Sequence, residues 1–173
     1  MKFLIMNLLL FAAVSQLNAQ QKYEVLTDDL ANGGKMLKGL ITKNELISDP
    51  AFKSWYDESQ RIYPTPDTAA VNALRNNADS IYFIVFGGTW CEDTHYVLPK
   101  FYKLVEASGF PEERITLYAS DRNKHTTGTI AEALGAANVP SIIVMKNGKE
   151  MGRVVEYGKT GRWDRELADI INQ

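Results

Sequence analysis

The second half of the chain alternates between strand patterns and helix patterns, which strongly restricts the folds open to it. Strand-length apolar runs predict strands at 81–86, 115–119, 142–145 and 152–157, and apolar spacing predicts helices around 98–105, 126–134 and 163–171. Asn147-Gly148 between the last two strands is a strong two-residue hairpin signal. The order βαβαββα requires a central mixed sheet, parallel at helical crossovers and antiparallel at the hairpin, with helices on both faces. The predicted class is a three-layer α/β fold.

Residues 20–80 are interpreted as a mainly helical N-terminal extension that packs on this core. One strand is expected at 36–41, after the turn signal Asn32-Gly33-Gly34. A helix is expected from Lys43, with Thr42 as its N-cap, an early interruption at Pro50, and an end at Tyr63-Pro64-Thr65-Pro66. A second helix is expected from Asp67 to Asn76-Asn77. The aromatic and aliphatic stripes of both helices are interpreted as core.

The first residues have the pattern of an export signal. Lys2 precedes an apolar run from Phe3 to Val14, and the segment ends on the small residue Ala19. The run is shorter than the roughly 20 apolar residues of a membrane-spanning helix. An uncleaved anchor is the alternative. We therefore expect a cleaved signal at 1–19, the extension at 20–80 and one core domain at 81–173. The mature protein is expected to be periplasmic or secreted and free of the membrane.

The charge of the chain excludes some classes of partner. The 173 residues carry a formal net charge of −2, so no basic surface is expected for nucleic acid or for anionic membranes. The apolar share of 45% and the charged share of 23% are those of an ordinary globular protein. Composition by itself assigns no function.

Residues 81–173 resemble the thioredoxin superfamily. The resemblance rests on an apolar strand that runs into Trp90-Cys91, Pro99 in the next helix, Val139-Pro140, the Lys146-Asn147-Gly148 hairpin and the final helix. It implies a thioredoxin-like fold in which Pro140 is cis and lies against Cys91, and in which Pro99 kinks the helix. A cis proline in this family shapes the substrate groove, and such bonds are rare elsewhere.

The chain also departs from the family pattern. Where thioredoxins have two cysteines separated by two residues, this sequence has Cys91-Glu92-Asp93-Thr94, so the resolving thiol is missing. Val85 stands where many members have a buried acid that relays protons. The remaining motif resembles that of thioredoxin-like proteins with Trp-Cys-x-Asp-Ser/Thr.

Cys91 is the only cysteine, so any thiol chemistry depends on it. It should lie at a helix N-terminus, where free N–H groups and the helix dipole stabilise a thiolate. Glu92 and Asp93 would oppose this if they lie close, or they are first-turn charges that face solvent. His95 could lie one turn along over the sulfur and act as a general acid, or it is simply exposed.

Thr94 occupies the position of the missing thiol. Its hydroxyl could donate to a Cys91 thiolate but cannot attack a mixed disulfide, so an outside thiol must complete any exchange. A role in helix capping is the alternative. The candidate catalytic residues are Cys91, Thr94 and His95, and the candidate groove residues are Trp90, Asp93, Val139 and Pro140.

The leading hypothesis is a monothiol thiol-disulfide oxidoreductase of the cell envelope, acting on protein disulfides or low-molecular-weight thiols. We expect no cofactor and no metal, because one cysteine and two distant histidines make no convincing ligand set. His125 is expected at the surface. The alternative is a redox-inactive module that binds extended peptides in the groove beside Trp90. A one-cysteine peroxidase is disfavoured, because Gly88 stands where that family has threonine.

Overall fold

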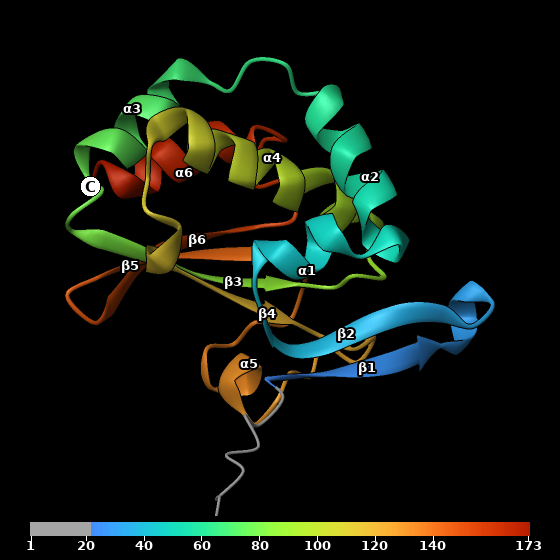
Figure 1. Cartoon of the computed structure of the whole chain (residues 1–173). Helices are drawn as coiled ribbons and strands as arrows, with labels where there is room; N and C mark the ends of the chain where they lie inside the picture. The colour runs from blue at the N-terminus through green and yellow to red at the C-terminus, as the bar shows by residue number, and fades with distance from the viewer. Residues whose placement is uncertain (1–21) are drawn as a thin grey trace, which may run out of the picture.

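The computed structural model describes residues 22–173, and the predicted signal at 1–19 lies outside them (Figure 1). The strands are β1 (Tyr23–Asp28), β2 (Gly34–Ile41), β3 (Ile81–Gly87), β4 (Ile115–Ala119), β5 (Ser141–Lys146) and β6 (Lys149–Val155). The helices are α1 (Lys43–Ser48), α2 (Pro50–Arg61), α3 (Thr68–Asn76), α4 (Glu92–Ser108), α5 (Ile130–Ala133) and α6 (Trp163–Ile171), with short 3₁₀ turns η1 (Asp29–Ala31) and η2 (Glu112–Arg114).

The strands form one six-stranded mixed sheet in the order β1-β2-β4-β3-β5-β6. Strands β3 and β4 are parallel, and every other neighbouring pair is antiparallel. Figure 1 shows α1, α2, α3, α4 and α6 on one side of the sheet and α5 on the other. The expected three-layer α/β fold with a mixed central sheet is thereby confirmed.

The two faces of the sheet carry cores of different size. The main core lies under the larger helical layer, and its largest fully buried side chains include Phe52, Phe83, Phe101, Leu74 and Leu104. The smaller core lies on the α5 side and contains Phe86, Ala131, Ala136, Val139, Ile143 and Met145, with Trp90 and Cys91 packed against it. Trp90 and Cys91, which directly precede α4, therefore face the thinner side of the molecule.

The N-terminal extension completes the sheet and the main core. The expected strand at 36–41 is confirmed as β2, which pairs with β4, and the capping box of Thr42 with Glu45 begins α1. Pro50 opens α2 at its first turn, where a missing N–H costs nothing. Strand β1 was not expected from the sequence. It is an edge strand that buries little side-chain surface, with Val25 50% exposed, so it lacks an apolar alternation.

Two boundaries differ from the expectation. Helix α5 covers 130–133 instead of 126–134, because residues 121–125 form a loop closed by Asp121, whose backbone and side chain bond to His125 and Asn123. Strand β6 begins at Lys149, because Asn147 and Gly148 both take positive φ and form a turn so tight that Lys146 pairs directly with Lys149.

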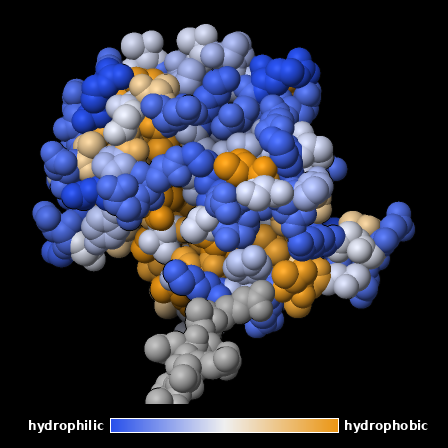
Figure 2. Space-filling view, viewed as in Figure 1, coloured by the Kyte–Doolittle hydropathy of each residue, from blue (hydrophilic) through white to orange (hydrophobic). Residues whose placement is uncertain are grey.

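The outer surface of the larger helical layer is mainly hydrophilic, while hydrophobic residues gather in the lower half of the same view, around β2 and α5 (Figure 2). Among residues 22–173, no helix is long and apolar enough to cross a membrane.

An ion pair ties β1 to the loop that follows β4. The Asp28 carboxylate is 3% exposed and receives two bonds from Arg122, Nε to Oδ1 at 2.6 Å and Nη2 to Oδ2 at 2.8 Å. Asp28 also accepts the Leu30 N–H and so caps η1. The hydrogen bond from Arg122 holds the pKa of Asp28 below its ordinary value of 3.8, although burial opposes this.

We predict that Asp28→Asn lowers the urea midpoint of unfolding at about pH 7, and that its difference from wild type shrinks as pH falls through the ordinary value of 3.8. The sign follows from the lowered pKa. A carboxylate that the native state keeps ionised contributes stability above the unfolded pKa, and this stability is lost as acid protonates it in the native state. Asp29→Asn, which alters the exposed neighbouring residue, is the matched control. A difference that persists undiminished at about pH 2 would contradict the assignment.

Candidate functional site

The turn from β3 into α4 leaves no room for side chains at Gly87 and Gly88. A Cβ at Gly88 would lie 2.7 Å from Trp90 Cε2, and a Cβ at Gly87 would lie 3.0 Å from Thr94 Cγ2. The two glycines thus let the indole and the threonine approach the backbone directly. This is the physical reason for the pattern Gly-Gly-Thr-Trp-Cys.

Hydrogen bonds from three directions fix this turn. The Leu37 N–H of β2 donates to Thr89 Oγ1 at 3.0 Å, and Trp90 Nε1 donates to the Ser120 carbonyl at 2.8 Å. Within the turn, the Cys91 N–H donates to the Gly88 carbonyl at 2.9 Å. The residues around the thiol are therefore held by β2, by the end of β4 and by the turn itself.

Cys91 is the N-cap of α4 and is half-buried. Its thiol donates to the Val139 carbonyl, with Sγ 3.3 Å from the oxygen. The Val139–Pro140 peptide bond is cis, as the sequence led us to expect. Trp90, Val139 and Cys91 all pack on the smaller core, so the structure brings these groove residues together around the thiol.

Thr94 is buried, with 1% exposure, and its Oγ1 accepts the Gly88 N–H at 3.1 Å. The hydroxyl therefore joins the first turn of α4 to the end of β3. Within residues 22–173, the Thr94 hydroxyl makes no other hydrogen bond. The sequence had suggested instead that it would donate to the Cys91 sulfur. The geometry assigns Thr94 a positioning role.

Pro99 lies inside α4, where its carbonyl accepts from Gln60 Nε2 at 3.1 Å.

His95 is held on the side of α2. Its ring stacks on Trp55, with centroids 4.2 Å apart and an interplanar angle of 13°. Its Nε2 lies 2.8 Å from the Thr89 carbonyl, and because a carbonyl can only accept, Nε2 carries the proton. Burial lowers the pKa of His95, with the Thr89 bond and Glu92 opposing. The ring is a neutral support of the turn near neutral pH, in contrast to the imidazolium over sulfur considered from the sequence.

The acidic residues that follow Cys91 point in different directions. Glu92 is exposed, in keeping with a first-turn charge in solvent. Asp93 is half-buried, and burial, followed by the nearby Asp93 carboxylate, raises the pKa of Tyr157 to about 12. Tyr157 in turn packs on Tyr96 with ring centroids 5.2 Å apart. Asp93, Tyr96 and Tyr157 form one side of the site, which we call the tyrosine side.

Two cations lie beside Trp90, and neither was among the candidate site residues predicted from the sequence. The Arg122 guanidinium carbon lies 4.9 Å from the Trp90 ring centroid, and Lys124 Nζ lies 5.4 Å from it. The Cys91 sulfur contributes to a raised pKa of Arg122, after the hydrogen bond and charge of Asp28. The predicted strands β3 and β4 could have pointed to these cations. Parallel strands place the loops at their carboxyl ends at one edge of the sheet, so the loop after β4 lies beside the turn after β3.

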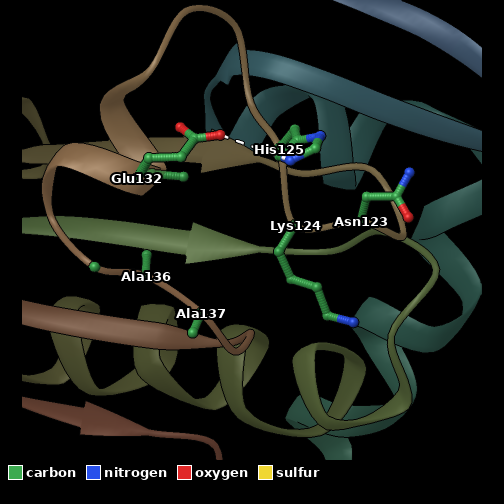
Figure 3. Close-up of a pocket in the computed structure, with 8 residues that line it drawn as sticks. Asn123, Lys124, His125, Glu132, Ala136 and Ala137 are labelled. Carbon is green, nitrogen blue, oxygen red and sulfur yellow. Dashed lines mark ion pairs between the residues drawn. The ribbon is translucent and has the colours of Figure 1, made fainter.

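A pocket of about 340 Å³ adjoins this cationic side (Figure 3). Its lining consists of Asn123, Lys124, His125, Ala131, Glu132, Gly135, Ala136 and Ala137. His125 is exposed, as expected, and its Nε2 lies 3.8 Å from the Glu132 carboxylate. Ala136, which lines the pocket, belongs to the same small core as Val139, and Cys91 packs against that core.

Comparisons with known proteins support only the fold. No family model matches the chain, and no curated protein matches it. A solved HIV epitope scaffold is similar, with 14% identity and a TM-score of 0.52 over 76% of this chain and 98% of the scaffold. A protein of unknown function from Pseudomonas aeruginosa matches with 13% identity and a TM-score of 0.48, over 69% of this chain and 81% of that one. The likeness to the scaffold concerns the three-layer architecture.

The part of the chain that the structure describes contains no set of metal ligands. Between residues 22 and 173, no group of three or more His, Cys, Asp or Glu side chains could hold an ion.

We predict that Thr94→Val lowers the free energy of unfolding by about 1–3 kcal/mol, because it leaves the buried Gly88 N–H without an acceptor while nearly preserving shape. Thr126→Val is the matched control. That threonine is also buried, but its hydroxyl makes only a long bond of 3.4 Å to the Thr127 carbonyl. Urea denaturation of both variants tests the assignment, and equal losses would argue against a specific bond at Thr94.

We predict that wild-type stability falls between about pH 7.5 and about pH 5.5, and that His95→Gln reduces this fall. Burial lowers the pKa of His95 in the native state, so the unfolded chain binds the proton first as pH falls through 6.5. The unfolded state therefore binds more protons in this pH range, so acid stabilises it relative to the native state. Urea midpoints of both proteins across this range provide the measurement. Parallel curves would mean that another group titrates.

Proposed function

We propose that this chain is an exported thioredoxin-like protein that catalyses thiol-disulfide exchange through Cys91 alone. The observation that carries the proposal is the position of the thiol. Cys91 begins the 17-residue helix α4, is half-buried beside Trp90, and lies 3.3 Å from the Val139 carbonyl next to a cis proline. A helix N-terminus favours a thiolate, and the Arg122 guanidinium lies over the ring of Trp90, the residue before Cys91.

The exchange proceeds in two balanced steps. The Cys91 thiolate attacks one sulfur of a substrate disulfide, a new S–S bond forms to Cys91, and the other sulfur leaves as a thiolate that takes a proton from solvent. A second thiolate from outside then attacks the substrate sulfur of this mixed disulfide and frees Cys91. The protein undergoes no net oxidation, because one disulfide is consumed and one is formed.

The proposed exchange needs an external second thiol because the chain has one cysteine. Cys91 is the only cysteine, and Thr94, in the position of a resolving residue, is buried with its oxygen bound by Gly88. The mixed disulfide therefore has no internal route of release. Protein disulfides and low-molecular-weight thiols in an oxidising envelope compartment are the partners proposed.

Substrate contact is proposed at the groove between Trp90 and the Val139–Pro140 loop. The Val139 carbonyl already accepts a hydrogen bond from the thiol, and this bond is lost when the thiol ionises or reacts. The carbonyl is then free to accept an N–H from a peptide or small amide beside the reacting sulfur. The tyrosine side and the Arg122 side would bound such a substrate.

We predict that native wild-type protein reacts with glutathione disulfide at least about tenfold faster than the same protein in denaturant, because folding supplies the helix N-terminus. The product is a single mixed disulfide that persists until an outside thiol is added. Intact mass spectrometry follows both steps, and Cys91→Ser is the control that must not change in mass.

A native rate equal to or below the denatured rate would contradict the exchange function. In that case, retention of partner binding by Cys91→Ala would favour the redox-inactive peptide-binding module. Trapping in cell extracts adds a second readout, since wild-type protein should accumulate covalent partners through Cys91 that Cys91→Ser does not.

A further inference from the structure

The loop 121–125 presents Lys124 in a conformation that non-glycine residues rarely adopt. Lys124 has φ +65°, in the left-handed region. The loop is held by Asp121, whose Oδ1 accepts from the N–H groups of Asn123 and His125 and whose Oδ2 pairs with Lys38 at 2.8 Å. Backbone strain of this kind persists where the surrounding bonds determine it, and it is a reason to ask what the side chain does.

The strained residue carries an ammonium group that has no carboxylate partner among residues 22–173. Arg122, two positions earlier, is committed to Asp28 through two hydrogen bonds. Lys124 has no ion pair within the described part of the chain, and its Nζ lies 5.4 Å from the Trp90 ring centroid. Arg122 is therefore a fixed charge beside the thiol, and Lys124 is an available one.

Lys124 also lines the pocket and lies beside Trp90, the residue that precedes Cys91. Figure 3 shows its side chain running away from the His125–Glu132 pair, along the side of the 340 Å³ pocket that it helps to line. Glu132 at the far end is engaged by His125. A ligand bound between Lys124 and Ala137 would thus meet a cation that lies 5.4 Å from the Trp90 ring centroid.

We propose that Lys124 is a specificity-determining residue that binds a carboxylate of the disulfide substrate in this pocket, next to the sulfur that Cys91 attacks. The inference rests on the proposed exchange function and gives its substrate class: disulfides bearing a carboxylate close to the S–S bond. A substrate with its carboxylate on the tyrosine side would instead meet the Asp93 carboxylate. The charges of the two sides therefore orient the substrate as well as select it.

The test uses small disulfides of similar length and different charge. Dithiodipropionate is anionic, bis(hydroxyethyl) disulfide is neutral and cystamine is cationic. The rate of Cys91 mixed-disulfide formation with each is measured by intact mass spectrometry and divided by the rate with the neutral compound. In wild type, the anionic disulfide should react faster than the cationic one by at least about threefold, the effect of one partly exposed charge pair.

Lys124→Gln should remove most of this preference, expressed as the ratio of each rate to the rate with the neutral disulfide, and Lys124→Arg should retain it. Lys149→Gln is the matched control, because it removes an exposed lysine with the same charge change at the β5–β6 hairpin. High salt should weaken the wild-type preference. The same anion-to-cation ratio in wild type and Lys124→Gln overturns the inference while the exchange function stands.

A binding measurement keeps the inference testable if the exchange function fails. Cys91→Ser protein, which cannot react, is titrated with dithiodipropionate and with cystamine while the Trp90 indole and Lys124 signals are followed by NMR. Shifts with the anion alone, lost in Lys124→Gln, support the carboxylate site, and equal or absent shifts overturn it. Repeating the kinetics with short peptide disulfides flanked by Asp or Lys tells whether the carboxylate comes from a small molecule or from an acidic peptide.

Discussion

The turn from β3 into α4 is the constraint on which the rest of the site depends. Because β3 pairs with β4 on one side and β5 on the other, this turn lies between the loops that follow β4 and precede β5. Gly87 and Gly88 leave space for Thr94 and Trp90, and bonds to Leu37, Ser120 and Thr94 then fix the backbone. The position of the thiol follows from this packing and needs no flexible element.

The residues around the thiol differ in charge and in how firmly their side chains are held. On one side, Arg122 is immobilised by Asp28 and stacks over Trp90, so its positive charge stays near the sulfur at little entropic cost. On the tyrosine side, the Asp93 carboxylate lies near Tyr157 and helps to raise the pKa of that phenol. Helical spacing suggested that His95 could reach the sulfur, but its ring instead stacks on Trp55 and its Nε2 lies within hydrogen-bonding distance of the Thr89 carbonyl. The local field is therefore set by residues distant in sequence.

The sequence was sufficient for the layers and for the core of the site, because both depend on local patterns. The apolar run at 81–86, the Asn147-Gly148 turn and the Trp90-Cys91 and Val139-Pro140 pairs have signatures readable in a few residues. It did not reveal β1, whose exposed edge has no alternation, nor Arg122 and Lys124, whose role arises from the parallel pairing of β3 with β4. Their polar loop looks like any surface loop until the sheet order is known.

The absence of a second thiol is built into the packing as well as into the sequence. Thr94 fills the resolving position with a buried hydroxyl that accepts the Gly88 N–H at 3.1 Å, and its Cγ2 sits against Gly87. A cysteine there would replace a strong oxygen acceptor with a weak sulfur one and a longer bond, and it would lose the methyl group that packs on the glycine. Introducing a resolving thiol would thus loosen the turn that positions Cys91. Thr94, which would leave the proposed exchange dependent on an outside thiol, thus also holds the turn that positions Cys91.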